Sequence, residues 1–197
     1  MAEFFRVAVL ASGGGSNLQA LLDACGEGSP ARVVLVLSNN PDAGALARAE
    51  AAGVTHGFVA NPADGPTLTR TLRDAGADLV VLAGYLKLVP PDTVAAFAGR
   101  MINVHPALLP AFGGPGMYGA RVHRAVLDSG AKESGASVHL VSAEYDRGEI
   151  IAQRPVPVLP GDSPASLAAR VLAVEHQLLA HVVLAAANAG KVVRLVG

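Results

Sequence analysis

Asn103 and His105 are the two residues whose types and spacing most directly suggest chemistry. They alternate with apolar residues in the first half of segment 101–110, and this two-residue period is typical of a β-strand. Both polar side chains are therefore expected to leave the sheet on the same side. Pro106 cannot donate to a strand ladder, so the pair should lie at the carboxyl end of the strand, where open α/β sheets bind ligands.

An amide next to an imidazole can stabilise a developing oxyanion and transfer protons. Removing one oxyanion donor costs roughly 3–4 kcal/mol of transition-state stabilisation, and a nearby carboxylate raises the pKa of a histidine and orients its ring. Candidates for this carboxylate are Glu144, Asp146 and Glu149, in the acidic segment that follows an expected strand at 135–141. The spacing does not choose among them, and it leaves open a purely structural role for the pair.

The glycine-rich segment 12–17 is a second candidate site, because it lies between an apolar run and a helical pattern. Glycines let a ligand approach the backbone, and the N-terminus of the following helix offers free N–H groups to a phosphate. The segment lacks the Gly-Lys-Ser/Thr ending of a Walker loop, and Leu18 stands where the dinucleotide fingerprint needs a small residue. The second strand ends at 38–40 without an acid for a ribose, which disfavours a nicotinamide cofactor. Phosphate binding and a plain tight turn both remain open.

Strands alternate with helices along the chain, and this order predicts a doubly wound, mostly parallel α/β sheet with helices on both faces. The glycine- and proline-rich segment 112–119 is either a mobile lid or a connection. No repeat or low-complexity linker interrupts the pattern, so we expect one domain over residues 1–197. Strands are expected at 6–11, 33–37, 54–59, 78–83, 101–105, 135–141, 150–158 (an edge strand, from its prolines) and 192–196, and helices at 18–25, 43–52, 67–75, 94–97, 121–127 and 165–189.

The composition argues against several classes of protein. Of the 197 residues 51% are apolar and 16% charged, with a formal net charge of −1, so neither disorder nor binding to nucleic acid is expected. The single cysteine, Cys25, excludes an intrachain disulfide and a four-cysteine zinc site, and it is expected to be buried. The six histidines form no His-Glu-x-x-His pattern, so no metal is expected. Neither a signal peptide nor a membrane span is evident, and we expect a cytoplasmic protein, monomer or homodimer, with small-molecule substrates.

Three motifs together resemble the folate-dependent formyltransferase family, and within it the phosphoribosylglycinamide formyltransferases. They are Ser-Gly-Gly-Gly-Ser-Asn-Leu-Gln-Ala at 12–20, Asn-Val-His-Pro-Ala-Leu-Leu-Pro at 103–110, and Ser-Val-His at 137–139 followed by Asp-Arg-Gly at 146–148. The second motif with a later Asp is shared by several folate formyltransferases. The glycine-rich start narrows the resemblance to the glycinamide ribonucleotide enzymes, and the match spans nearly the whole chain.

The resemblance implies a formyl transfer from 10-formyltetrahydrofolate to the amine of glycinamide ribonucleotide, by direct attack through a tetrahedral intermediate, in de novo purine biosynthesis. It implies that Asn103, His105 and Asp146 are the catalytic residues. Asn103 and protonated His105 would stabilise the oxyanion, and Asp146 would keep His105 charged. No metal is required.

The resemblance also implies a cis peptide at Leu109–Pro110, and it assigns binding residues. His139, on an expected strand, is a candidate for supporting the catalytic residues. The phosphate and ribose would be bound by Gly15, Ser16, Asn17 and Glu175, and the folate by Leu86, Lys87, Leu88, Val89, Asn103, Ser142, Ala143, Glu144, Tyr145 and Asp146.

The chain departs from the family pattern at three places, and other functions stay open. Segment 63–67 is shorter and lacks an arginine that often meets the folate, Arg147 stands where Gly is common, and loop 113–119 is longer than in some members. Alternatives are a formyltetrahydrofolate hydrolase, a formyltransferase with another amine acceptor, and a non-catalytic phosphate-binding module. The phosphate turn and the length of 197 residues argue against the first two.

Overall fold

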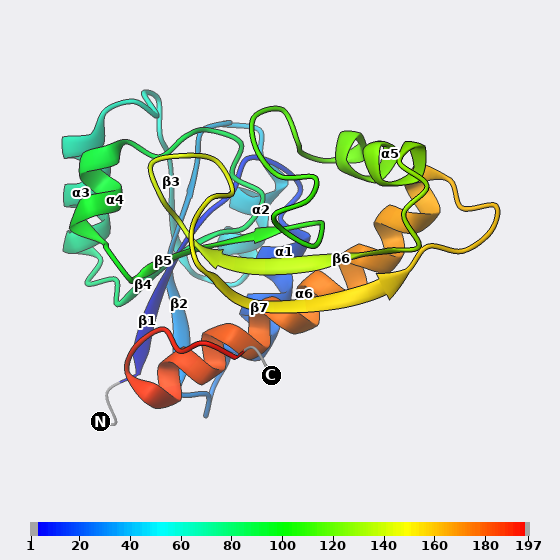
Figure 1. Cartoon of the computed structure of the whole chain (residues 1–197). Helices are drawn as coiled ribbons and strands as arrows, with labels where there is room; N and C mark the ends of the chain where they lie inside the picture. The colour runs from blue at the N-terminus through cyan, green and yellow to red at the C-terminus, as the bar shows by residue number, and fades with distance from the viewer. Residues whose placement is uncertain (1–3, 196–197) are drawn as a thin grey trace.

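The structure, a computed structural model, describes residues 4–195. It is one seven-stranded sheet with helices on both faces (Figure 1). The strand order is β3-β2-β1-β4-β5-β6-β7, in which β1 to β5 are parallel and the last two strands pair antiparallel. In chain order the elements are β1 Phe5–Leu10, α1 Ser16–Ala24, β2 Ala31–Ser38, α2 Gly44–Ala51, β3 Thr55–Phe58, α3 Gly65–Asp74, β4 Leu79–Leu82, α4 Pro91–Ala96, β5 Met101–His105, α5 Ala120–Asp128, β6 Glu133–Leu140, β7 Ile150–Pro157 and α6 Pro164–Ala189.

The expected doubly wound sheet is confirmed, and β7 is an edge strand as its prolines indicate. The expected strand at 192–196 is wrong for residues 192–195, and Val196 lies outside the described residues. In this segment the Leu195 amide donates to the Ile151 carbonyl at 2.8 Å, and a single contact of this kind does not build a ladder. The cis peptide at Leu109–Pro110 is present.

The central strands are buried on both faces, which explains their uninterrupted apolar runs. Val7 and Val9 of β1 point into one core, which α1, α2 and α6 cover. Ala8 and Leu10 point into the other core, which α3 and α4 cover. The two-residue period of β1 therefore divides its side chains between two layers. Cys25 belongs to the first core, as expected, and burial raises the pKa of its thiol to about 11, so it stays a thiol.

Helix α6 has 26 residues and is long and apolar enough to cross a membrane by length and composition alone. In the structure it lies instead along the sheet, in contact with β6 and α1 (Figure 1). It begins with a capping box formed by Ser163 and Ser166, and it ends at Gly190 in the left-handed conformation. Its buried side chains fill the core next to α1, and one of them, Glu175, is ionisable.

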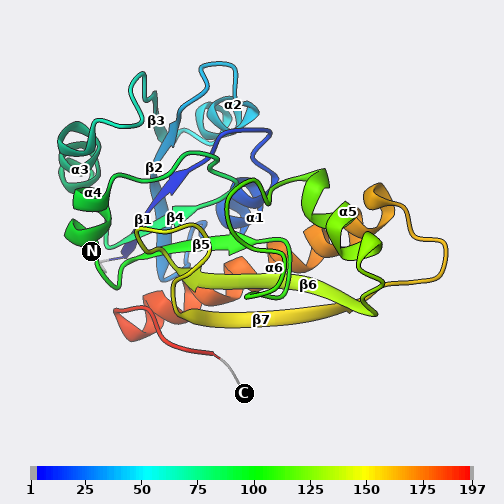
Figure 2. The same cartoon turned by 45° about the horizontal axis from the view of Figure 1, so that its top comes forward.

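The strand order brings the carboxyl ends of β1, β4 and β5 next to one another. The order reverses between β1 and β4, and open α/β sheets bind ligands at such a point. The loops that follow β5 and β6 lie together over this edge (Figure 2), where the Gly114 amide donates to the Asp146 carboxylate at 2.9 Å. Segments far apart in the sequence therefore meet at one end of the sheet.

Candidate active site

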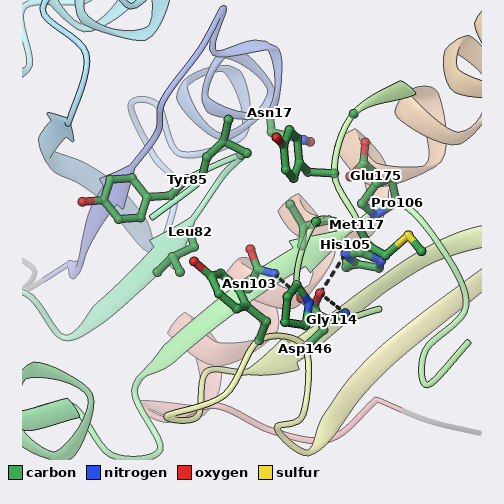
Figure 3. A pocket seen from close by; sticks show the side chains of 18 of the residues that line it. Asn17, Leu82, Tyr85, Asn103, His105, Pro106, Gly114, Met117, Asp146 and Glu175 are labelled. Carbon is green, nitrogen blue, oxygen red and sulfur yellow. Dashed lines mark hydrogen bonds and ion pairs between the residues drawn. The ribbon is translucent and has the colours of Figure 1, made fainter. Parts of the chain in front are cut away.

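A cavity of about 890 Å³ opens at the carboxyl ends of β4 and β5. Its walls come from the loop after β4, the end of β5, the loops that follow β5 and β6, and helix α6. Figure 3 shows Asn103, His105 and Asp146 close together on one side of it, with Asn17 and Glu175 farther along. The structure thus brings together residues that the sequence analysis assigned to catalysis and to the ribonucleotide.

Asp146 is the acid that meets the Asn103–His105 pair. Its Oδ2 lies 3.5 Å from His105 Nδ1, and its Oδ1 lies 3.4 Å from Asn103 Nδ2. The side chains of His105 and Asp146 are only 4% and 8% exposed. Of the other two candidates, Glu144 lies on the cavity wall but is exposed, and Glu149 is outside the wall. Spacing alone left this choice open, and the geometry makes it.

The loop after β5 is closed onto His105 and Asp146. The Phe112 carbonyl lies 2.8 Å from His105 Nε2, and both Phe112 and Asp146 have a positive φ of 56°. The left-handed conformation is common for Asp but a strained outlier for Phe. Both ring nitrogens of His105 therefore face an oxygen of the protein, and a substrate reaches Nε2 only when the Phe112 contact opens.

Burial is the largest influence on the pKa of His105, and it lowers this pKa below the usual value of an imidazole. The charge of Asp146 and the Phe112 carbonyl raise the pKa but do not outweigh the burial. Asp146 thus raises the pKa of His105, as expected, but in the empty cavity burial lowers it by more. For Asp146 itself burial would raise the pKa, yet bonds and charges from His139, His105 and the Gly114 amide together lower it. The lowered pKa of His105 favours a neutral imidazole at neutral pH, beside the carboxylate of Asp146.

His139 orients the amide of Asn103. Its Nδ1 lies 2.8 Å from the Leu140 carbonyl, and its Nε2 lies 3.0 Å from Asn103 Nδ2 and 3.4 Å from Asp146 Oδ1. The second hydrogen of that amide points to Asp146 over the longer distance of 3.4 Å. An oxyanion that takes the place of this long contact would gain a donor. His139 therefore lies beside Asn103, in the supporting position that the sequence left open for it.

Asn17 and Glu175 form the other end of the cavity. Glu175 is 7% exposed and accepts a hydrogen bond from the Asn17 side chain, while Asn17 Oδ1 is buried and has no partner among residues 4–195. Burial raises the pKa of Glu175 to about 7, although the Asn17 bond lowers it in part. Gly15 and Ser16 lie in the adjoining turn, beyond the cavity wall. Of the four expected ribonucleotide contacts, two therefore face the cavity directly.

Replacing Glu175 by glutamine is expected to stabilise the free protein at pH 8 by about 3 kcal/mol and to change little at pH 4.5. In the folded protein this carboxyl has a pKa of about 7, against a usual value of 4.5. Stability that is fully present below pH 4.5 is therefore lost as the pH rises through 7, because the folded state resists the ionisation of Glu175. Urea unfolding at both pH values measures this difference. An equal gain at both would show that the charge of Glu175 is not the cause.

The opposite wall of the cavity is largely apolar. Leu86, Leu88 and Tyr145 are 49%, 42% and 38% exposed and surround the mouth, which suits a flat aromatic ligand. The expected folate residues that line the cavity are Leu86, Lys87, Leu88, Val89, Asn103, Ser142, Glu144, Tyr145 and Asp146, whereas Ala143 does not line it. Ala143 is exposed and lies between Ser142 and Glu144, which both line the cavity.

Several lining residues were not found from the sequence. Segment 112–119 was expected to be a lid or a connection, and residues 114–119 form part of the wall. His123 on α5 also lines the cavity, is 4% exposed and has a buried Nδ1 without a partner. Its pKa is lowered mainly by burial and further by the neighbouring His105, whose protonated form would repel a second positive charge. The only signal for it was its place beside Val122 and Val126 on the buried face of that helix.

No cluster of three or more metal-ligating side chains occurs within residues 4–195.

Gly15 is required where the glycine-rich turn meets α2. Its φ is +74°, and an added Cβ would lie 2.7 Å from Ala45 Cα, which is backbone and cannot give way cheaply. Gly15→Ala is therefore expected to lower the free energy of unfolding by about 1–3 kcal/mol. Gly13→Ala is the matched control, because a Cβ there meets nothing within 4 Å. Equal stability of the two variants in urea would contradict this account.

Comparison with protein families finds a match to the formyl transferase model over residues 5–183. This match covers β1 to the last third of α6, and it includes every residue of the cavity wall.

Individual relatives agree with that match. A chloroplastic phosphoribosylglycinamide formyltransferase of Arabidopsis thaliana is 47% identical over 186 residues, which are 90% of this chain and 64% of the relative. The chain thus spans less than two thirds of that protein's length. A phosphoribosylglycinamide formyltransferase of Escherichia coli is 41% identical over 88% of this chain and 82% of its own. The crystal structure of glycinamide ribonucleotide transformylase 1 from Symbiobacterium toebii has a TM-score of 0.88 at 41% identity, covering 96% and 90% of the two chains.

Proposed function

The chain belongs to the formyl transferase family, and on that premise we propose that it transfers a formyl group from 10-formyltetrahydrofolate to the amine of glycinamide ribonucleotide. The observation that carries this proposal is the position of Asn103, His105 and Asp146 in one cavity, between its apolar mouth and its polar end at Asn17 and Glu175. The names of the relatives from Arabidopsis thaliana and Escherichia coli support the choice of acceptor. The reaction would belong to purine biosynthesis and needs only small-molecule partners.

Each substrate has an end of the cavity that suits it. The apolar mouth around Leu86, Leu88 and Tyr145 would hold the ring system of the folate, with its formyl group towards Asn103. The turn before α1 and the Asn17–Glu175 pair would hold the phosphate and ribose, because free backbone N–H groups bind phosphate and a buried carboxylate accepts from hydroxyls. The amine and the formyl carbon would then meet next to His105.

In the proposed reaction the neutral amine attacks the formyl carbon and gives a tetrahedral intermediate with an oxyanion and a positively charged nitrogen. Asn103 Nδ2 donates to the oxyanion in exchange for its 3.4 Å contact with Asp146. Once the Phe112 contact has opened, Nε2 of neutral His105 takes the proton from the attacking nitrogen and passes it to N10 of the folate. The carbon–N10 bond then breaks, and the products are the formylated ribonucleotide and tetrahydrofolate.

The lowered pKa of His105 fits this order of steps. A neutral imidazole can accept the first proton, and Asp146 stabilises the imidazolium that exists until the second transfer. The carboxylate is already ionised, since its own pKa is lowered. His105 therefore acts first as a base and then as an acid, with no net change in its protonation.

A spectrophotometric assay tests the proposal, using 10-formyltetrahydrofolate with and without glycinamide ribonucleotide. Release of tetrahydrofolate only when the ribonucleotide is present is the expected result. Release without the ribonucleotide would show a hydrolase, and release with other amines alone would show a different acceptor. No turnover under any of these conditions would overturn the enzymatic proposal in favour of a binding module.

A further inference from the structure

We propose that Arg48, on helix α2, is a positioning residue for the substrate phosphate and acts from behind the glycine-rich turn without touching the ligand. The inference rests on the proposed function, because it takes the phosphate of the ribonucleotide to bind at the start of α1. No motif in the sequence marks Arg48, which lies in an alanine-rich helix. Its side chain is exposed and contributes no core packing.

Helix α2 holds the turn at two successive carbonyls. The Ala45 amide donates to the Gly13 carbonyl at 3.1 Å, and Arg48 Nε donates to the Gly14 carbonyl at 2.8 Å. The same guanidinium donates to Gln19 Oε1 on α1 at 3.0 Å. Arg48 thus bridges the turn and the first turns of the helix that follows it.

These two contacts orient the N–H groups that a phosphate would use. In a planar trans peptide the C=O and the next N–H point in opposite directions. Because the carbonyls of Gly13 and Gly14 point to α2, the amides of Gly14 and Gly15 point away from α2. Neither amide donates to an acceptor within residues 4–195, and Gly15 caps α1 without a side-chain bond. The free donors therefore add to those at the N-terminus of α1.

The positive charge of Arg48 strengthens this arrangement. A charged donor on the Gly14 carbonyl polarises the same peptide group whose N–H belongs to Gly15, and hydrogen bonds in such a chain reinforce one another. The lysine and arginine that line the cavity are Lys87 and Arg124, which belong to the loop after β4 and to α5. Arg48 instead supplies a cation directly behind the glycine-rich turn.

The experiment compares Arg48→Met and Arg48→Lys with the wild-type chain, on glycinamide ribonucleotide and on its phosphate-free form, glycinamide riboside. For Arg48→Met we expect KM for the ribonucleotide to rise roughly tenfold, the size of one charge-assisted hydrogen bond, with kcat and KM for the folate unchanged. Arg48→Lys keeps the charge but loses the guanidinium that donates to both Gly14 and Gln19. Its KM for the ribonucleotide is expected to lie between those of the wild type and Arg48→Met. The kcat/KM for the riboside should stay the same in all three proteins.

Arg73→Met is the control for loss of a surface charge, because Arg73 lies on α3 at the other face of the sheet. It is expected to leave every constant unchanged. An unchanged KM of Arg48→Met, or an equal loss with ribonucleotide and riboside, would overturn the positioning role. Failure of the proposed function looks different, since the wild-type chain itself would then show no turnover with the ribonucleotide.

Discussion

Replacing His105 by alanine is expected to lower kcat by roughly 10²–10⁴-fold, the usual contribution of a positioned acid–base group. The imidazole contacts both Asp146 and the Phe112 carbonyl, and alanine has no group that could carry out its proton transfers from this place. Water can enter the polar space that the ring leaves. The fold and the binding of the folate should therefore persist, which circular dichroism and a folate titration would check.

His56 provides a matched control for this variant. It is an exposed histidine on β3, at the opposite edge of the sheet, and its Nδ1 meets only the carbonyl of Val54. His56→Ala should keep the wild-type kcat. If His105→Ala kept more than a tenth of the wild-type kcat while folded, the proton transfer assigned to His105 would be refuted.

The prediction of the site from the sequence succeeded where short-range periodicity decides the outcome. Asn103 and His105 face the same side because they are two residues apart in one strand, and Pro106 ends that strand. Uninterrupted apolar runs likewise indicated the central strands. These features depend on neighbours in the chain, and the sequence contains them directly.

Features that depend on long-range packing were not accessible in the same way. Asp146 is 43 positions from Asn103 and reaches it through the antiparallel pairing of β5 with β6, so only the family resemblance singled it out from the other acids. The sign of the pKa shift of His105 depends on burial by the loop at Phe112, which spacing does not reveal. The contact from the Phe112 carbonyl is made by the backbone, and a sequence carries no mark of it.

Glu175 illustrates the same limit at the other end of the cavity. An acid in an apolar helix can be solvated or buried, and the pattern of α6 allows both. In the structure it is buried against Asn17, a residue from the opposite end of the chain, and that burial alone raises its pKa to about 7. The resemblance named the residue, whereas the tertiary contact defines its chemistry.

Asp146→Asn is expected to lower kcat by about 10³-fold while the geometry of the site is kept. Asparagine has the same shape, tolerates the positive φ of 56° and can still accept from the Gly114 amide. What it loses is the charge that faces the imidazolium formed during the reaction. At 3.5 Å, such a pair is worth about 4–5 kcal/mol at the effective dielectric of a partly buried site, which corresponds to roughly 10³-fold or slightly more in rate.

The same substitution should lower the pKa of His105 further, because the charge of Asp146 is the largest influence that raises it. Titration of the His105 ring by nuclear magnetic resonance measures this directly in the free protein. Below its pKa the ring is charged and above it neutral, so in Asp146→Asn the neutral form should persist to lower pH than in the wild type. Glu149→Gln, which removes an exposed acid of the same segment, should change neither kcat nor the titration.

The two measurements on Asp146→Asn together separate its possible roles. A fall in both kcat and the pKa would mean that the carboxylate stabilises the imidazolium during proton transfer. A fall in kcat with an unchanged pKa would mean that Asp146 acts through Asn103 or the Gly114 contact, and the electrostatic account would be abandoned. Because the carboxylate contacts both Asn103 and His105, the pKa of His105 is the quantity that distinguishes the two cases.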